Sequence, residues 1–273
     1  MPLGFALFFG GLLAGLVLPG DWLPGRLVGA LTVVGFVTLG VGAVLTYLPV
    51  MPRIAPREIG APVAGRWSAL NSPGSKVPSH GLHAYGQTFA IDLVYEPGEG
   101  SRPAFGEGPA FRPPEDFPAF GEPVLAPADG RVVAVRDGAR DHRSRSTWAA
   151  FGYMIVEGFV RELGGPRHVI GNHVVVDIGD GTYAAVAHVQ QGSARVRPGD
   201  TVRRGDVVGR CGNSGNSSEP HVHFQLMEHP RPALAAGLPF VFADVSIADS
   251  PPKAGVPANE QTMVAGRSAF TTS

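Results

Sequence analysis

Short apolar runs separated by polar turns make up most of the chain after residue 77. They are rich in β-branched residues and lie between Gly, Pro, Asn and Asp, which is the pattern of short strands joined by tight turns. The stretch VVVDIGDGTYAAV (174–186) predicts a hairpin that turns at Asp-Gly. The pattern therefore predicts an antiparallel all-β domain. The runs expected to form strands are TFAIDLVY (88–95), RVVAVRD (131–137), GYMIVEG (152–158), HVVVDIG (173–179), TYAAVAHV (182–189), DVVGRCG (206–212) and HVHFQLM (221–227).

The first 50 residues have a different pattern, with two long runs that contain no charge. Residues 3–18 read LGFALFFGGLLAGLVL, and residues 27–50 read LVGALTVVGFVTLGVGAVLTYLPV. A membrane-spanning helix needs about 20 apolar residues. We therefore expect residues 1–50 to form a membrane anchor of two transmembrane helices. A signal segment is the alternative for the first run, although residues 1–6 lack the Lys or Arg that usually begins one.

Four further segments are expected to lie outside the strands. Residues 51–77 contain several Pro and Arg and predict a juxtamembrane linker, and the tail 247–273 is expected to be flexible. Residues 96–122 are too rich in Pro and Gly for a core element, and residues 138–151 are polar and basic. Both are expected to be surface loops inserted into a domain that spans 78–246.

Charge and cysteine content narrow the possible partners and metal ligands. The formal net charge is −1, and we find no basic stretch of the kind that nucleic-acid-binding proteins carry. The single cysteine, Cys211, excludes an internal disulfide and a site with several thiolates. Any metal ion bound by the chain would therefore be held by His, Asp or Glu.

Several of these residue types are placed where they could meet. His221 and His223 are two residues apart, so on a strand their side chains share one face. Asp92 lies within an apolar strand, where an unpartnered carboxylate costs several kcal/mol, so we expect a positive charge or a metal to face it. A catalytic zinc takes three protein ligands from His and carboxylate. The other candidates are His80, His83 and His188, whereas His142, His168, His173 and His229 are expected to be structural or surface residues.

Three blocks of sequence together resemble the lysostaphin/LytM-type zinc metallopeptidases. They are GNSGNSSEPHVHF (212–224), YAAVAHV followed by VRPGDTVRRGDVVGRCGNSG (183–215), and GEPVLAPADGRVVAV (121–135) behind an upstream His and Asp. The resemblance covers about residues 78–227, interrupted by the two insertions, and implies a LytM-like β-sandwich with a groove. It also implies Zn²⁺ held by an upstream His, Asp92 and His223, with His188 and His221 in catalytic roles.

The upstream ligand is ambiguous in this chain. The best-known members have His and Asp four residues apart, whereas Asp92 lies nine residues after His83 and twelve after His80. SHG ahead of GQTFAID resembles a membrane-associated branch of the family, which favours His80 and leaves His83 as the alternate.

The resemblance implies a zinc metalloendopeptidase that cleaves cross-links or stem peptides of peptidoglycan. Such a substrate requires a catalytic domain on the extracytoplasmic side of the cell membrane. Arg26 would then lie in the cytoplasm, although Arg53 and Arg57 favour the reverse orientation by the charge rule. Two alternatives are an inactive scaffold that activates other cell-wall hydrolases and a peptidase for a protein substrate. Whether the 96–122 insertion acts as an autoinhibitory lid is left open.

Overall fold

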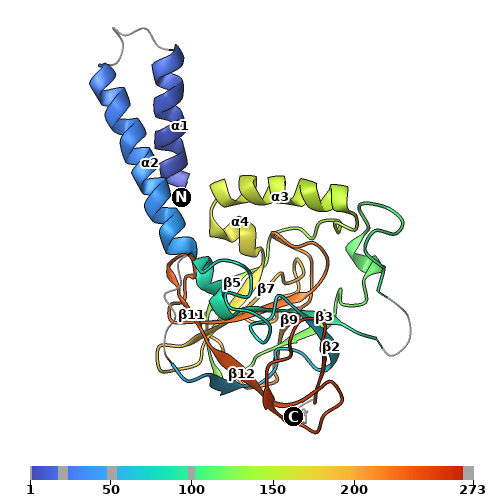
Figure 1. The fold of residues 1–273 in the computed structure, drawn as a ribbon. Helices are drawn as coiled ribbons and strands as arrows, with labels where there is room; N and C mark the ends of the chain where they lie inside the picture. Colours follow the sequence, from blue (N-terminus) through green and yellow to red (C-terminus); the bar gives the residue numbers. More distant parts are fainter. Residues whose placement is uncertain (1, 18–23, 48–53, 98–101, 267–273) are drawn as a thin grey trace. The chain divides into compact units, whose positions relative to one another are not determined.

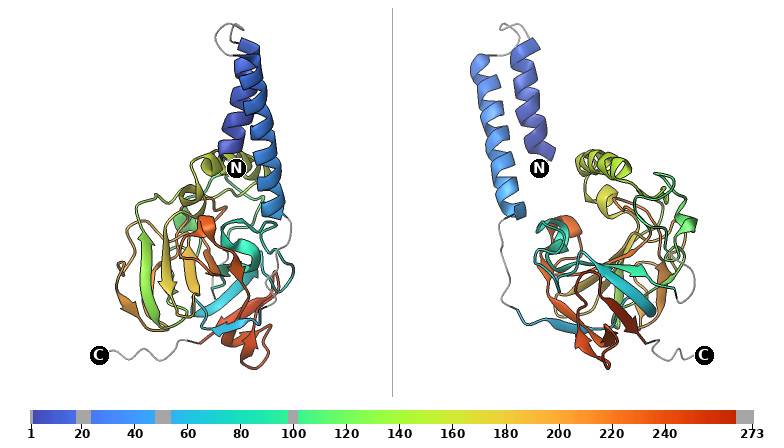
Figure 2. Two further views of the ribbon diagram at one scale, coloured as in Figure 1. Left: turned by 90° about the vertical axis from the view of Figure 1, so that its left-hand side faces the viewer. Right: turned by 45° about the vertical axis from the view of Figure 1, so that its right-hand side comes forward.

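The computed structural model describes residues 2–17, 24–47, 54–97 and 102–266 (Figures 1 and 2). The chain divides into two compact units, residues 1–50 and 51–273. Each unit has its own internal packing.

The first unit is a pair of apolar helices, α1 (Pro2–Val17) and α2 (Gly25–Tyr47). They pack closely: a Cβ on Gly35 would lie 2.3 Å from the backbone nitrogen of Phe8, so glycine permits the approach. The rings of Phe8 and Phe36 lie 6.0 Å apart. Within the described residues one helical segment, Gly25–Val44, is long and apolar enough to cross a membrane, whereas α1 is shorter. The two-helix anchor therefore stays a prediction.

The second unit is mainly β-sheet. One sheet of 12 strands carries the path β1-β12-β14-β2-β3-β10-β7-β6-β5-β8, with β11 beside β10 and β13 beside β12, and β4 pairs with β9 separately. The strands are β1 Arg57–Ile59, β2 Gly65–Leu70, β3 Ile91–Tyr95, β4 Pro123–Leu125, β5 Gly130–Arg136, β6 His173–Asp177, β7 Tyr183–Ala187, β8 Thr201–Val202, β9 Val207–Arg210, β10 Val222–Met227, β11 Gly237–Leu238, β12 Phe240–Ile247, β13 Lys253–Gly255 and β14 Thr262–Ala265. The helices are α3 Trp148–Leu163, α4 Pro166–Ile170 and the 3₁₀ turns η1 Ala84–Phe89, η2 Pro114–Asp116 and η3 Pro232–Leu234.

The pairing follows the expected antiparallel pattern with one exception, the parallel pair β1–β12. The predicted hairpin is confirmed, because β6 and β7 pair with Asp177 opposite Tyr183. Its turn places Gly179, Asp180 and Gly181 at positive φ, a conformation that Gly and Asp tolerate best.

The core lies against the central strands and is dominated by aromatic and β-branched side chains. Trp67, Phe224 and Phe242 are completely buried. The rings of Phe224 and Phe240 lie 4.9 Å apart, edge to face, which is a favoured geometry for aromatic pairs. This packing holds β2, β10 and β12 around one apolar centre.

Strands extend beyond both ends of the expected domain, residues 78–246. The expected linker 51–77 contains β1 and β2, and the expected flexible tail contains β13 and β14. β14 pairs with β2, so that Met263 lies opposite Trp67, and both side chains are fully buried. Each segment alone is too short and too rich in Pro or Gly to indicate a strand, and each is stabilised by the other.

The region between β5 and β6 also differs from the expectation. Residues 152–158, predicted as a strand, belong to the helix α3, which lies outside the sheet (Figure 1). Thr147 caps the helix by accepting a hydrogen bond from the Ala150 amide. The preceding loop is not a surface loop, since Ser144 and Arg145 are buried. In the 96–122 segment, Phe117 is buried as well.

Polar contacts hold the inner side of α3 to the domain. Glu157 pairs with the buried Arg145 and, one helical turn on, with Arg161 at 3.6 Å. The Arg161 guanidinium also donates to the Gly215 carbonyl. Burial alone would raise the pKa of Glu157, but the hydrogen bond and charge of Arg145 outweigh it and lower the pKa below the ordinary 4.5.

We therefore expect α3 to loosen in acid. Because the folded-state pKa of Glu157 is depressed, its stabilisation is complete above pH 4.5 and is lost as the pH falls through the folded value. The Glu157→Gln variant should lower the opening free energy of α3 by about 1.5–3 kcal/mol at pH 7. This difference from wild type should shrink in acid, and amide hydrogen exchange, corrected for intrinsic rates, measures it. The exposed Glu260→Gln is the control, and a pH-independent effect of Glu157→Gln would contradict the expectation.

Candidate active site

Strand register brings the first candidate residues together. β10 lies between β3 and β7, with His223 directly opposite Asp92 on one side and Ala187 on the other. Opposite residues in paired strands point to the same face with Cβ atoms about 4.5–5.5 Å apart. His188 follows Ala187 at the end of β7, with φ at 59°. The neighbouring strands β3, β10 and β7 therefore position Asp92, His223 and His188 close together.

The carboxylate of Asp92 is the centre of the cluster. Its Oδ1 lies 2.9 Å from His223 Nδ1 and 3.4 Å from His221 Nε2. Its Oδ2 lies 3.1 Å from His80 Nε2 and accepts a hydrogen bond from Asn71 Nδ2 at 2.8 Å. His80, Asp92 and His223 each offer one ligand atom, all within 4.8 Å of one another.

Further hydrogen bonds orient the imidazoles of His223 and His80. The second nitrogen of His223, Nε2, lies 2.8 Å from the amide oxygen of Gln225, an acceptor, so Nε2–H donates to Gln225 and Nδ1 is the nitrogen that faces Asp92. The Gln225 amide is itself fixed by donating to the carbonyl of Tyr85 at 2.7 Å. In His80, Nδ1 faces the Ser79 hydroxyl at 3.1 Å and Nε2 faces Asp92. Such outer contacts are typical of metal-binding histidines.

His188 and His221 form the other side of the cluster. Nδ1 of His188 lies 2.7 Å from the Ser214 carbonyl, and Nδ1 of His221 lies 2.8 Å from the Glu219 carbonyl. A carbonyl only accepts, so in both residues Nδ1 carries a proton and Nε2 can exchange one in the neutral form. The two rings lie 4.7 Å apart.

Burial and charge shift the pKa values strongly here. Burial by itself would raise the pKa of Asp92, yet the charges of His80 and His221 and the hydrogen bonds from His221 and His223 hold it well below its usual value. Burial, and then the charges of His221 and His223, lower the pKa of His188 well below its usual value. For His221 the effect of burial is outweighed by Asp92, and its pKa is raised. The Asp92 carboxylate is therefore ionised at neutral pH.

The loop 212–219 holds His188 in place. The Ser214 hydroxyl donates to the Val189 carbonyl and accepts from the Asn172 amide, so the Ser214 carbonyl is fixed beside His188. Gly215, at φ 80°, lies so close to Gly171 that a Cβ on it would meet the Gly171 nitrogen at 2.6 Å. This close approach explains the glycine in the GNSGNSS stretch.

The remaining histidines lie outside the cluster. His83 contacts the Thr88 hydroxyl at 3.0 Å and is not among the converging atoms, whereas His80 is. His142 is buried, with Nε2 beside the Gly215 carbonyl, and His173 contacts Gly171. Sequence analysis missed Asn71 and Gln225. The second could have been found, because Gln225 follows His223 at the same strand spacing as His223 follows His221.

A pocket of about 430 Å³ opens onto this cluster. One wall comes from the cluster around Asp92 and from Asn71 and Tyr85, and another from α3, through Phe151, Met154 and Glu162. The hydroxyl of Tyr85 donates to Glu162 and so joins the two walls. Among the described residues of the 96–122 insertion, none lines this pocket.

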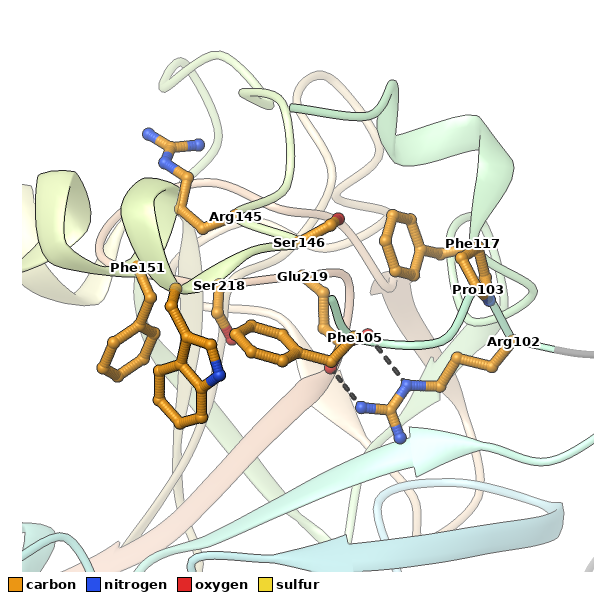
Figure 3. A pocket seen from close by; sticks show the side chains of 10 residues that line it. Arg102, Pro103, Phe105, Phe117, Arg145, Ser146, Phe151, Ser218 and Glu219 are labelled. Atoms are coloured by element: carbon orange, nitrogen blue, oxygen red, sulfur yellow. Dashed lines mark hydrogen bonds and ion pairs between the residues drawn. The ribbon is translucent and has the colours of Figure 1, made fainter. Parts of the chain in front are cut away.

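That insertion instead lines a neighbouring pocket of about 270 Å³ (Figure 3). Arg102 Nε donates to Glu219 at 2.8 Å, which ties the insertion to the loop before His221. Phe105 and Phe117 contribute apolar surface. The two pockets share Phe151 and Ser218, so they adjoin.

Comparison with known proteins places this arrangement in a family. The model of peptidase family M23 matches residues 115–233. The match covers less than half of the chain, and within it the chain is similar to the M23 peptidases. The expected relationship to lysostaphin/LytM-type peptidases is therefore confirmed. The matched region includes His188, His221 and His223, whereas His80 and Asp92 precede it.

Individual relatives of the M23 domain are distant. The peptidoglycan DD-endopeptidase ShyA of Vibrio cholerae is 32% identical over 83 residues, which are 30% of this chain and 18% of ShyA. The chain thus matches less than a fifth of that relative's length. The catalytic domain of lysostaphin from Staphylococcus simulans is 19% identical, with 64% of this chain and 88% of that chain covered and a TM-score of 0.33. The catalytic domain of the M23 protein EnpA from Enterococcus faecalis is 23% identical, with 52% and 92% covered and a TM-score of 0.30.

Proposed function

We propose that this chain is a zinc-dependent endopeptidase that hydrolyses peptide bonds of peptidoglycan outside the cytoplasm. The observation that carries the proposal is the convergence of His80, Asp92 and His223 in a pocket that two further histidines also enter. Three protein ligands with room for a fourth position are the arrangement of catalytic zinc sites. The M23 match and the similarity to a peptidoglycan endopeptidase support the reaction class and the substrate.

The three side chains fit a zinc ion. Ligands about 2.0–2.1 Å from a tetrahedral zinc lie roughly 3.3 Å from one another. The Asp92 oxygens lie 2.9 Å from His223 Nδ1 and 3.1 Å from His80 Nε2, close to that spacing. Zinc bound there would act as a Lewis acid toward the scissile carbonyl and lower the pKa of water.

His188 and His221 would handle protons and the developing oxyanion. Each keeps Nδ1–H on a backbone carbonyl, which holds its ring with Nε2 available for exchange. A protonated Nε2 would donate to the oxyanion of the tetrahedral intermediate, and a neutral one would accept a proton from water. Gln225 and Asn71 would orient the ligands through these hydrogen bonds.

A peptidoglycan substrate requires a catalytic domain outside the cytoplasm. The apolar segment Gly25–Val44 would hold it at the cell membrane. We propose two transmembrane helices with both chain ends outside, because the peptidase domain follows the second helix.

Zinc content separates the two proposed upstream ligands. The full-length protein in detergent should carry about one zinc per chain. Zinc should be lost in His80→Ala, Asp92→Ala and His223→Ala. It should be retained in His83→Ala, because the His83 imidazole contacts the Thr88 hydroxyl instead of Asp92. Elemental mass spectrometry measures the metal, and circular dichroism checks folding. Loss of zinc in His83→Ala together with retention in His80→Ala would reverse the assignment.

Gln225 should tune the affinity for zinc. Replacing it with Leu removes the acceptor for His223 Nε2–H but keeps the volume, so zinc affinity should fall about 10–100-fold. Competition with a fluorescent chelator measures this. Gln191→Leu, at an exposed position, is the matched control, and equal affinities for wild type and Gln225→Leu would show that the contact does not support the site.

Removal of either proposed catalytic histidine should slow hydrolysis strongly while zinc remains bound. We expect His188→Ala and His221→Ala to lower the rate on purified cell walls about 10²–10⁴-fold. Chromatography of released muropeptides measures the rate and identifies the bond. Zinc-loaded wild type that fails on cell walls but stimulates another cell-wall hydrolase would support the scaffold alternative, and cleavage of casein alone would support a protein substrate.

A further inference from the structure

The helix α3 is turned with its charges inward and its large apolar side chains outward. Glu157, Arg161 and Glu162 make the inward contacts described above. Trp148 is 76% exposed, Ile155 61% and Val156 63%. The further exposed apolar residues on this helix are Tyr153, Phe159, Val160 and Leu163. A water-facing helix normally shows the opposite arrangement.

Two phenylalanines of the 96–122 insertion extend this surface. Phe105 packs edge-on against Trp148, with ring centroids 5.0 Å apart, and Phe111 packs against Tyr153 at 5.9 Å. Both phenylalanines remain exposed themselves. We call these two residues and the seven exposed apolar residues of α3 the α3 face. An exposed apolar patch of this kind marks an interaction surface.

The composition of the α3 face suits a bilayer interface. Trp, Tyr, Phe and branched aliphatic side chains are those that insert at the boundary between headgroups and acyl chains. Exposed arginines precede the helix at Arg140 and Arg143 and follow it at Arg167. Guanidinium groups near such a helix attract anionic lipid headgroups.

The chain also keeps the domain within reach of a bilayer. Residues 48–53 separate the end of α2 at Tyr47 from the first described residue of the domain, Ile54. At about 3.3–3.6 Å per residue this segment spans roughly 25 Å at most. If Gly25–Val44 crosses the membrane, this short segment therefore holds the domain close to the lipid surface and gives the two a high effective concentration.

We propose that the α3 face docks on the membrane surface, with its aromatic and aliphatic side chains inserted at the level of the lipid headgroups. The inference rests on the membrane anchoring contained in the proposed function. The opposite side of α3 lines the active-site pocket through Phe151 and Met154. Docking therefore steadies the wall of that pocket and holds the site beside the bilayer.

A fluorescent probe on the α3 face tests this in the full-length protein. Cys211 is buried, so Ile155→Cys can be labelled selectively with a polarity-sensitive dye. Leu234→Cys is the matched control, because Leu234 is a similarly exposed apolar residue outside the α3 face. Both labelled proteins are reconstituted into phosphatidylethanolamine–phosphatidylglycerol vesicles that contain spin-labelled lipid. Selection of vesicles with outward-facing domains gives both probes the same access.

Docking predicts severalfold stronger quenching by the spin-labelled lipid at position 155 than at position 234, with blue-shifted emission at 155 only. Equal quenching at the two positions would overturn the proposal. So would a probe at 155 that is blue-shifted but unquenched, which would indicate a second copy of the chain on this face. A paired substitution, Val156→Glu with Val160→Glu, should abolish the quenching at 155 and leave zinc content unchanged.

Alkaline extraction of the same vesicles separates the two proposals. If the protein stays in the vesicles but the probe at position 155 is unquenched, docking is contradicted and the membrane anchoring is not. If alkali releases the protein, the membrane anchoring in the proposed function is contradicted, and so is the docking that depends on it. Zinc content and hydrolysis of cell walls report on the peptidase in either case.

Discussion

A buried carboxylate surrounded by imidazoles is the constraint on which this site depends. Asp92 lies 6% exposed between β2 and β10, where an ionised group is stable only if positive charge or hydrogen-bond donors surround it. His223 meets it from the paired strand, His80 from the preceding loop, and Asn71 from the end of β2. The low pKa of Asp92 is the electrostatic result of this arrangement, and the same arrangement suits a divalent cation.

The rest of the domain keeps that arrangement rigid. The strand register sets Asp92 and His223 opposite each other, and the Phe224 ring behind them is anchored among Phe240 and Phe242. The 212–219 loop holds His188 through one carbonyl, and Gln225 holds His223 through one amide. A metal site and its neighbouring histidines require this precision, because a ligand displaced by 1 Å no longer binds well.

The helix α3 has two sides with different roles. Its inner side uses charge pairs where a helix on a β-domain normally uses apolar packing, and these pairs free its apolar side chains to face outward. One helix thereby forms both a wall of the pocket and an exposed apolar surface of seven large side chains. The stretch that matches the M23 family model, residues 115–233, includes α3.

The family resemblance alone implied that Asp92 meets His223, which lies 131 residues away in the sequence. Local patterns in the sequence were enough to predict the β6–β7 hairpin and the two apolar N-terminal runs. Each of these depends on alternation, turn residues or length within one short stretch. The resemblance already favoured His80 over His83, and the structure shows His80 facing Asp92. Only the tertiary structure could reveal that 262–265 pairs with 65–70 and that Gly152–Gly158 is helical. These features depend on partners distant in the chain. Met263 is a core residue because Trp67 lies opposite it, and Glu157 points inward because Arg145 is buried there. Local sequence sets what a segment can form, and the contacts between remote segments select which form has the lower free energy.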